Sequence, residues 1–163
     1  MKNIVLIGMP GVGKSTIGVV LAKNLGMAFI DSDLVIQEQE DKRLHELIAE
    51  HGIDGFIKIE NDVNSSINPK KAVIATGGSA VYGEEAMKHF KSIAKIIYLQ
   101  LSYESIEDRL GDLTKRGVVL RDGQTLKDLY EERVPLYQKY ADKIIDCENK
   151  GIREIVNQIA KIF

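Results

Sequence analysis

The sequence predicts an α/β fold in which a parallel sheet lies between layers of helices. Five short apolar runs typical of buried strands alternate with segments whose apolar residues recur at helical spacing. The predicted strands are residues 4–7, 28–31, 72–76, 96–99 and 143–147. Strands of a parallel sheet are covered on both faces, so they carry continuous apolar runs. The regular alternation with helices therefore predicts a parallel sheet covered on both sides.

A glycine-rich loop follows the first strand. Residues 8–16, GMPGVGKST, match the phosphate-binding pattern G-x-x-x-x-G-K-[ST] at every fixed position. The strand before the loop and the helix after it, from Ile17 to Leu25, are the context that this motif requires. The alternative, a glycine-rich turn that carries Lys-Ser by chance, does not explain this context.

The loop residues predict contacts with a nucleoside triphosphate. The glycines allow successive backbone N–H groups to face a phosphate chain at the N-terminus of the helix. We expect Lys14 to reach the β- and γ-phosphates as a point charge and the Ser15 hydroxyl to bind Mg²⁺. The predicted nucleotide-binding residues of the loop are Gly11, Val12, Gly13, Lys14, Ser15 and Thr16.

Composition limits the possible partners. The 163 residues fit one domain over 1–163, and 22 basic against 24 acidic residues give a net charge of −2, so no general surface for nucleic acid is expected. The single cysteine, Cys147, excludes an intrachain disulfide and is expected to be buried. The N-terminus enters the first strand without a basic or long apolar segment, which predicts a cytoplasmic protein without a membrane anchor.

Acidic residues and glycines stand where the next strands end. Asp31 and Asp33 follow the second strand and begin another helix, and Gly77-Gly78 follow the third. In an open α/β sheet ligands bind at this edge, although either Asp31 or Ser32 could simply cap the helix. A glycine pair means close backbone approach to a ligand or to the next helix.

The second half of the chain continues the same alternation. Helices are expected over residues 43–51 and 54–67, separated near Gly52, over 103–110, over 126–140 despite Pro135, and over 152–163. His45 and His51 do not share one helical stripe, so surface positions are expected rather than a metal pair.

The basic segment at about 111–125, with Arg116, is either a mobile flap over phosphates or an ordinary surface loop. The loop, acids, glycines and flap together predict phosphoryl transfer.

With these residues in place, the chain resembles the shikimate kinases, relatives of the nucleoside monophosphate kinases, over nearly its whole length. The resemblance rests on residues 8–16, 29–33, Gly55-Phe56 with Glu60, 75–78, Arg109, Arg116 and 132–137. It implies a three-layer P-loop NTPase fold with a central five-stranded parallel sheet flanked by helices, and a flap that closes over ATP. It also implies an enzyme that uses ATP and Mg²⁺ to convert shikimate to shikimate 3-phosphate. We expect the protein to be a monomer.

The resemblance also implies roles for individual residues. Asp33 would bind the acceptor hydroxyls and accept a proton, Asp31 would lie near Mg²⁺ through water, Gly77 and Gly78 would contact the acceptor, and Arg133 would bind its carboxylate. Arg116 would meet the phosphates from the flap, and Arg109 would lie near adenine.

Three positions depart from the family pattern. The arginine of the family's G-x-x-x-F-R motif is Ile57, a third glycine is Ser79, and the proline after the flap arginine is Gly117. Ile57 is therefore a candidate apolar wall of the acceptor site, and Glu60 lacks its usual partner.

Three other functions stay open: a kinase of another small hydroxylated metabolite, a nucleoside monophosphate kinase, and a nucleotide-binding protein without catalysis.

Overall fold

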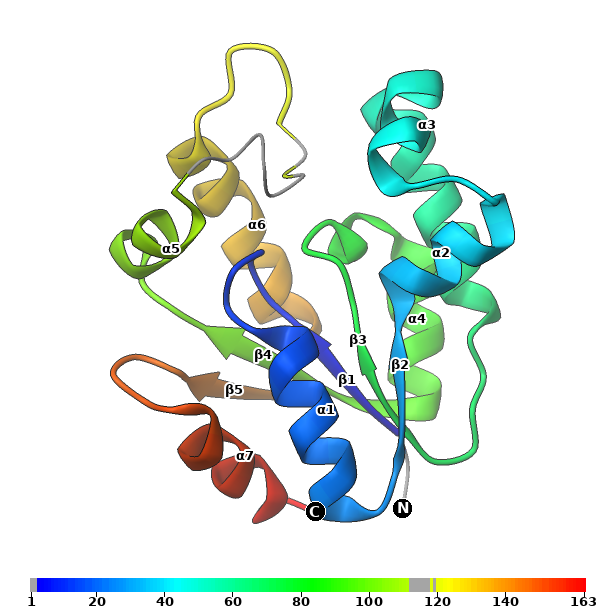
Figure 1. Ribbon diagram of the computed structural model, residues 1–163. Coiled ribbons are helices and arrows are strands. Elements are labelled where there is room, and N and C mark those ends of the chain that lie inside the picture. The colour runs from blue at the N-terminus through cyan, green and yellow to red at the C-terminus, as the bar shows by residue number, and fades with distance from the viewer. Residues whose placement is uncertain (1–2, 112–117, 119) are drawn as a thin grey trace.

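The protein is built on one five-stranded parallel sheet in the computed structural model, which describes residues 3–111, 118 and 120–163. Its strands, in the spatial order β2-β3-β1-β4-β5, all pair in parallel (Figure 1). Their bounds are β1 Asn3–Ile7, β2 Ala28–Asp31, β3 Ala72–Ala75, β4 Ala94–Gln100 and β5 Lys143–Asp146. The strand that precedes the glycine-rich loop is thus central, and the predicted sheet is confirmed.

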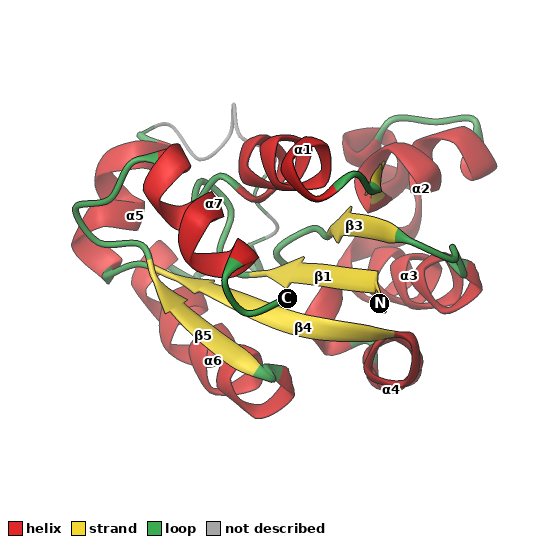
Figure 2. Cartoon of the chain, turned by 90° about the horizontal axis from the view of Figure 1, so that it is seen from below, coloured by secondary structure: helices red, strands yellow, loops and turns green. Residues whose placement is uncertain are grey.

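Helices cover both faces of the sheet. Their bounds are α1 Lys14–Leu25, α2 Ser32–Glu40, α3 Leu44–Ser66, α4 Glu84–Ile93, α5 Tyr103–Leu110, α6 Leu126–Tyr140 and α7 Ile152–Ala160, with a short 3₁₀ helix at Ala80–Tyr82. Figure 2 shows α1 and α7 on one face and α4 and α6 on the other. The sheet between them is almost fully buried in β1, β3 and the middle of β4, which explains their continuous apolar runs.

The break expected near Gly52 is confirmed, because Gly52, with φ 73° and ψ 177°, is non-helical and kinks α3 between two helical parts. One local feature differs from the sequence-based expectation. The helix α4 was not predicted. Its buried residues Ala86, Met87 and Phe90 lie on one face of a short segment that is otherwise polar, so the periodic signal is brief.

The parallel sheet brings the predicted site residues to one edge. The glycine-rich loop leaves the carboxyl end of β1, Asp31 ends β2, and Gly77 and Gly78 follow β3. Because neighbouring strands run in the same direction, these segments leave the sheet side by side. No helix in the described ranges is both long and apolar enough to cross a membrane.

Candidate active site

The glycine-rich loop wraps around the side chain of Lys14. Gly11 and Gly13 have φ values of 87° and 99°, a region that favours glycine, and Gly13 caps the N-terminus of α1. The buried Lys14 Nζ donates hydrogen bonds to the carbonyl oxygens of Gly8, at 2.7 Å, and Met9, at 2.9 Å. Burial lowers the pKa of Lys14 to about 8, so the ammonium group stays mostly charged at neutral pH.

Ser15 and Asp31 form an oxygen-rich pair beside this loop. Ser15 Oγ donates to Asp31 Oδ2 at 2.9 Å, while Asp31 Oδ1 accepts from the backbone N–H of Asp33 at 3.0 Å and caps α2. Asp31 is therefore a helix cap, as the sequence allowed, and also a partner of Ser15. Mg²⁺ prefers few protein ligands of this hard oxygen type, completed by water and phosphate oxygens. The pair fits such an ion, and the described residues contain no cluster of three or more metal-binding side chains.

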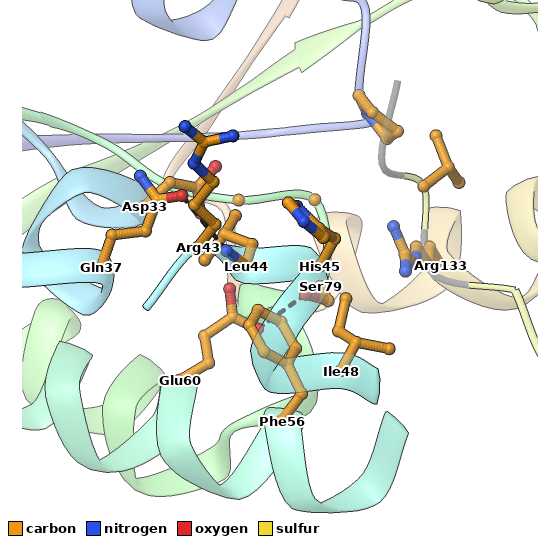
Figure 3. Close-up of a pocket in the computed structure, with 14 residues that line it drawn as sticks. Asp33, Gln37, Arg43, Leu44, His45, Ile48, Phe56, Glu60, Ser79 and Arg133 are labelled. Carbon is orange, nitrogen blue, oxygen red and sulfur yellow. Dashed lines mark hydrogen bonds between the residues drawn. The ribbon is translucent and has the colours of Figure 1, made fainter. Parts of the chain in front are cut away.

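A cavity of about 360 Å³ opens between α2, α3, α6 and the segment after β3 (Figure 3). It combines carboxyl groups, nitrogen-bearing side chains and an apolar wall. Its lining residues are Pro10, Asp33, Gln37, Arg43, Leu44, His45, Ile48, Phe56, Glu60, Gly77, Gly78, Ser79, Val118 and Arg133. A space of this size and mixed polarity suits a small polar ligand.

Two carboxyl groups meet at Gly77. A Cβ atom there would lie 2.8 Å from Asp33 Oδ1 and 3.0 Å from Glu60 Oε2, so only glycine leaves room for both. Burial, and secondly the Asp31 carboxylate, raise the pKa of Asp33 to about 6. Burial also raises the pKa of Glu60 to about 7. Both groups can therefore exchange a proton near neutral pH.

Glu60 is held by one of the residues that depart from the family pattern. Ser79 Oγ donates to Glu60 Oε1 at 2.6 Å. Glu60 Oε2 has no hydrogen-bond partner among the described residues, although the residue is only 1% exposed. A buried carboxylate oxygen without a partner costs free energy, so this atom is ready to accept a hydrogen bond from a ligand.

Arg133 supplies a buried positive charge to the same cavity. The residue is only 2% exposed, its Nε donates to the Tyr82 hydroxyl at 3.3 Å, and its guanidinium lies 5.4 Å from the centre of the Tyr82 ring. A Cβ atom at Gly78 would come within 2.9 Å of Arg133 Nη1. Tyr137, also on α6, donates to the carbonyl oxygen of Gly78 at 2.7 Å. These contacts fix the arginine beside the glycine pair.

Arg109 lies on the other side of the glycine-rich loop. Its Nη1 donates to the carbonyl oxygens of Gly11 and Val12, both at 3.3 Å. It borders a second cavity of about 270 Å³, lined by Leu101, Ser105, Asp108, Arg109, Glu148, Asn149 and Lys150. The contact of Arg109 with adenine stays a prediction.

Not every predicted site residue is placed at the cavity or by the loop contacts above. Arg116 falls outside the described residues, and Thr16 is exposed on α1. Ile57 lines a neighbouring hollow with Lys58 and Tyr82, because successive helical residues point about 100° apart and Phe56 already faces the cavity. Ile57 therefore does not form a wall of the cavity described above.

Sequence reasoning gave no site role to several residues that line the cavity, among them Gln37, Arg43 and His45. His45 is exposed, as expected of a surface histidine, yet it stands at the cavity mouth. Its spacing of three residues from Ile48 shows that the two share a helix face, but the sequence does not show that this face borders the cavity.

Comparison with known proteins gives a consistent result. The family model described as shikimate kinase matches residues 10–163. A shikimate kinase of Thermodesulfovibrio yellowstonii is 39% identical over 166 residues, which cover 100% of this chain and 95% of that protein. A shikimate kinase of Francisella tularensis subsp. holarctica is also 39% identical, over 98% of this chain and 93% of the relative.

Solved structures agree with the sequence comparison. The shikimate kinase from Acinetobacter baumannii in complex with shikimate superimposes with a TM-score of 0.89 at 29% identity, covering 99% of this chain and 92% of the other. The enzyme from Aquifex aeolicus gives a TM-score of 0.82 at 31% identity, with 98% and 94% covered. The phosphate loop, the Asp33 cavity and these full-length matches together show that the chain belongs to the shikimate kinase family.

Proposed function

We propose that this protein transfers the γ-phosphoryl group of ATP to a hydroxyl of shikimate and yields shikimate 3-phosphate. Family membership makes it an ATP-dependent kinase that phosphorylates a hydroxyl group. The observation that best supports the acceptor is the cavity itself, where the carboxyl group of Asp33 and the guanidinium of Arg133 line one small space beside the phosphate loop. A hydroxy acid carries the two groups that this pair can bind.

Asp33 is the proposed partner of the reacting hydroxyl. With a pKa of about 6 it is mostly ionised at pH 7 and can accept a hydrogen bond from the hydroxyl and then its proton. Arg133 is proposed to hold the acceptor carboxylate, because a guanidinium matches a carboxylate in both charge and shape. The backbone of Gly77 and Gly78 lines the space between them.

The phosphate side of the reaction is assigned to the loop. Lys14, already directed into the loop, would stabilise charge on the β- and γ-phosphates. Ser15 and Asp31 would hold Mg²⁺, which neutralises charge on the phosphate oxygens when bound. Arg109 and the flap residue Arg116 would contact the adenine and the phosphates, respectively. The cytoplasmic location and monomeric state inferred from the sequence remain predictions.

An ADP-release assay across different acceptors tests the proposal. Shikimate, other hydroxy acids, polyols and nucleoside monophosphates are compared at equal concentration, and the phosphorylated product is identified by NMR. We expect ADP release with shikimate to exceed that with each other class by at least tenfold. A polyol or nucleoside monophosphate as the best substrate would overturn the proposed acceptor, and no stimulation by any acceptor would favour nucleotide binding without catalysis.

A further inference from the structure

The cavity holds more acidic than basic groups in its buried part. Asp33 and Glu60 both meet at Gly77, and Arg133 is the guanidinium buried opposite them. A hydroxy acid would bring a further carboxylate into this space. Because an uncompensated buried charge costs several kcal/mol, more N–H donors or positive charge should face the ligand.

Two nitrogen-bearing side chains at the start of α3 line the cavity mouth. Arg43 immediately precedes the helix and His45 lies in its first turn, and both border the space along with Leu44 (Figure 3). Neither side chain forms a hydrogen bond or ion pair with another residue in the described ranges. Their polar atoms are therefore available to a ligand.

The neighbouring residues behave differently. Lys42 forms an ion pair with Glu50, and His51 lies 3.7 Å from the other oxygen of the same carboxylate. Neither Lys42 nor His51 lines the cavity. The nitrogen-bearing side chains of this region thus divide into a pair, Lys42 and His51, beside Glu50 and a pair, Arg43 and His45, that lines the cavity.

The start of α3 is also anchored to its surroundings. Gln37 Oε1, from α2, accepts a hydrogen bond from the Leu44 N–H at 3.2 Å, and Glu46 Oε1 accepts from the Arg43 N–H at 3.1 Å. These bonds fix the backbone that carries Arg43 and His45. A binding group on a fixed backbone loses less freedom when the ligand arrives.

We propose that Arg43 and His45 bind the carboxylate of the acceptor together with Arg133, so that this chain holds its substrate from α3 without an arginine at position 57. The inference rests on the proposed function, since it names the residues that recognise one group of the proposed substrate. Arg133 lines the cavity from α6, and Arg43 and His45 line it from the start of α3, so the ligand carboxylate would be held from two different elements.

Steady-state kinetics of matched variants provide the test. Arg43→Ala, His45→Ala and the double variant are compared with Lys42→Ala and His51→Ala, which remove a basic side chain and a histidine that do not line the cavity. We expect the double variant to raise KM for shikimate by roughly 10- to 100-fold, with KM for ATP and kcat changed less than about twofold. The two control variants should retain the wild-type KM for shikimate. Circular dichroism and thermal unfolding confirm that each variant is folded.

An uncharged acceptor distinguishes the loss of a carboxylate contact from a general distortion of the cavity. With methyl shikimate, the KM of the double variant should stay within about twofold of wild type, because the charge that Arg43 and His45 recognise is gone. An equal rise in the KM for shikimate and for methyl shikimate would overturn the inference. It would also be overturned if the double variant had the same KM for shikimate as the two control variants. If the wild type does not phosphorylate shikimate, the proposed function fails instead, and the variants are tested on its preferred acceptor. An acceptor without a carboxylate would then refute the role of Arg43 and His45 as well.

Discussion

Replacing Asp33 with Asn should remove activity and at the same time stabilise the protein at neutral pH. Burial and the nearby Asp31 raise the pKa of Asp33 from 3.8 to about 6, so the folded protein holds the ionised carboxylate at a cost. Over that pH range the folded state binds the proton more tightly than the unfolded chain does. The stability of the wild type therefore falls as pH rises from about 4 to about 6, by at most about 3 kcal/mol.

Asparagine does not ionise, so the variant avoids this cost. We expect the free energy of unfolding of Asp33→Asn to exceed that of wild type by up to about 3 kcal/mol above pH 6, with the difference shrinking toward zero near pH 4. Turnover should fall by roughly 10²–10⁴-fold, because the hydroxyl loses its proton acceptor. In the wild type, kcat/KM should decline about tenfold per pH unit below about pH 6.

Urea unfolding between pH 4 and 8, with a coupled ADP-release assay on the same samples, measures both effects. Asp62→Asn is the control, since Asp62 is exposed and pairs with Lys58 at 3.4 Å, and its stability should change by less than about 0.5 kcal/mol. A stability difference between Asp33→Asn and wild type that did not vary with pH would show that burial of the carboxylate is not its cause. Wild-type turnover in the variant would show that Asp33 takes no part in the reaction.

Three further substitutions address the rest of the site. Lys14→Ala should abolish detectable phosphorylation while the thermal unfolding temperature stays near or above that of wild type, because burial of this ammonium opposes folding; normal kinase rates would contradict the assignment. Asp31→Asn should raise the Mg²⁺ concentration needed for half-maximal activity, and a defect that is independent of Mg²⁺ would reject the predicted metal contact. Ser79→Ala removes the donor to Glu60 and should destabilise the fold by about 1–3 kcal/mol in urea unfolding, a loss that Ser66→Ala, at an exposed helix end, should not reproduce.

Local patterns were sufficient to predict the sheet and the phosphate loop. The loop motif lies within nine consecutive residues, and each strand carries its own apolar run, so no distant contact had to be known. The strand pattern placed Asp33 at the ligand-binding edge, and the family resemblance supplied its role and that of Arg133. The structure brings the two residues to the same cavity although 100 positions separate them in the chain.

The rest of the site depends on how helices rotate and pack. Ser79 and Glu60 form a pair across 19 positions, and neither residue alone signals the other. Ile57 and Phe56 are adjacent, yet only Phe56 faces the cavity, because the rotation of α3 decides which one does. His45 stands at the cavity mouth on the part of α3 that precedes the kink at Gly52. Sequence spacing shows which residues share one face of a helix, but it does not show which neighbouring element that face packs against.

Proton uptake on acceptor binding offers a final test of the charge arrangement. Glu60 has a pKa of about 7 and is therefore close to half protonated at pH 7, and the residue lines a cavity that an anionic acceptor would enter. An added carboxylate nearby and further exclusion of water both raise the pKa of a carboxyl group. Binding of shikimate at pH 7 should therefore take up as much as about half a proton per site, measured by calorimetry in buffers of different ionisation enthalpy. Glu60→Gln should remove most of this uptake, since Asp33, with its lower pKa, contributes less at this pH. Proton release on binding would contradict this prediction, because it would mean that the acceptor stabilises the ionised form of Glu60.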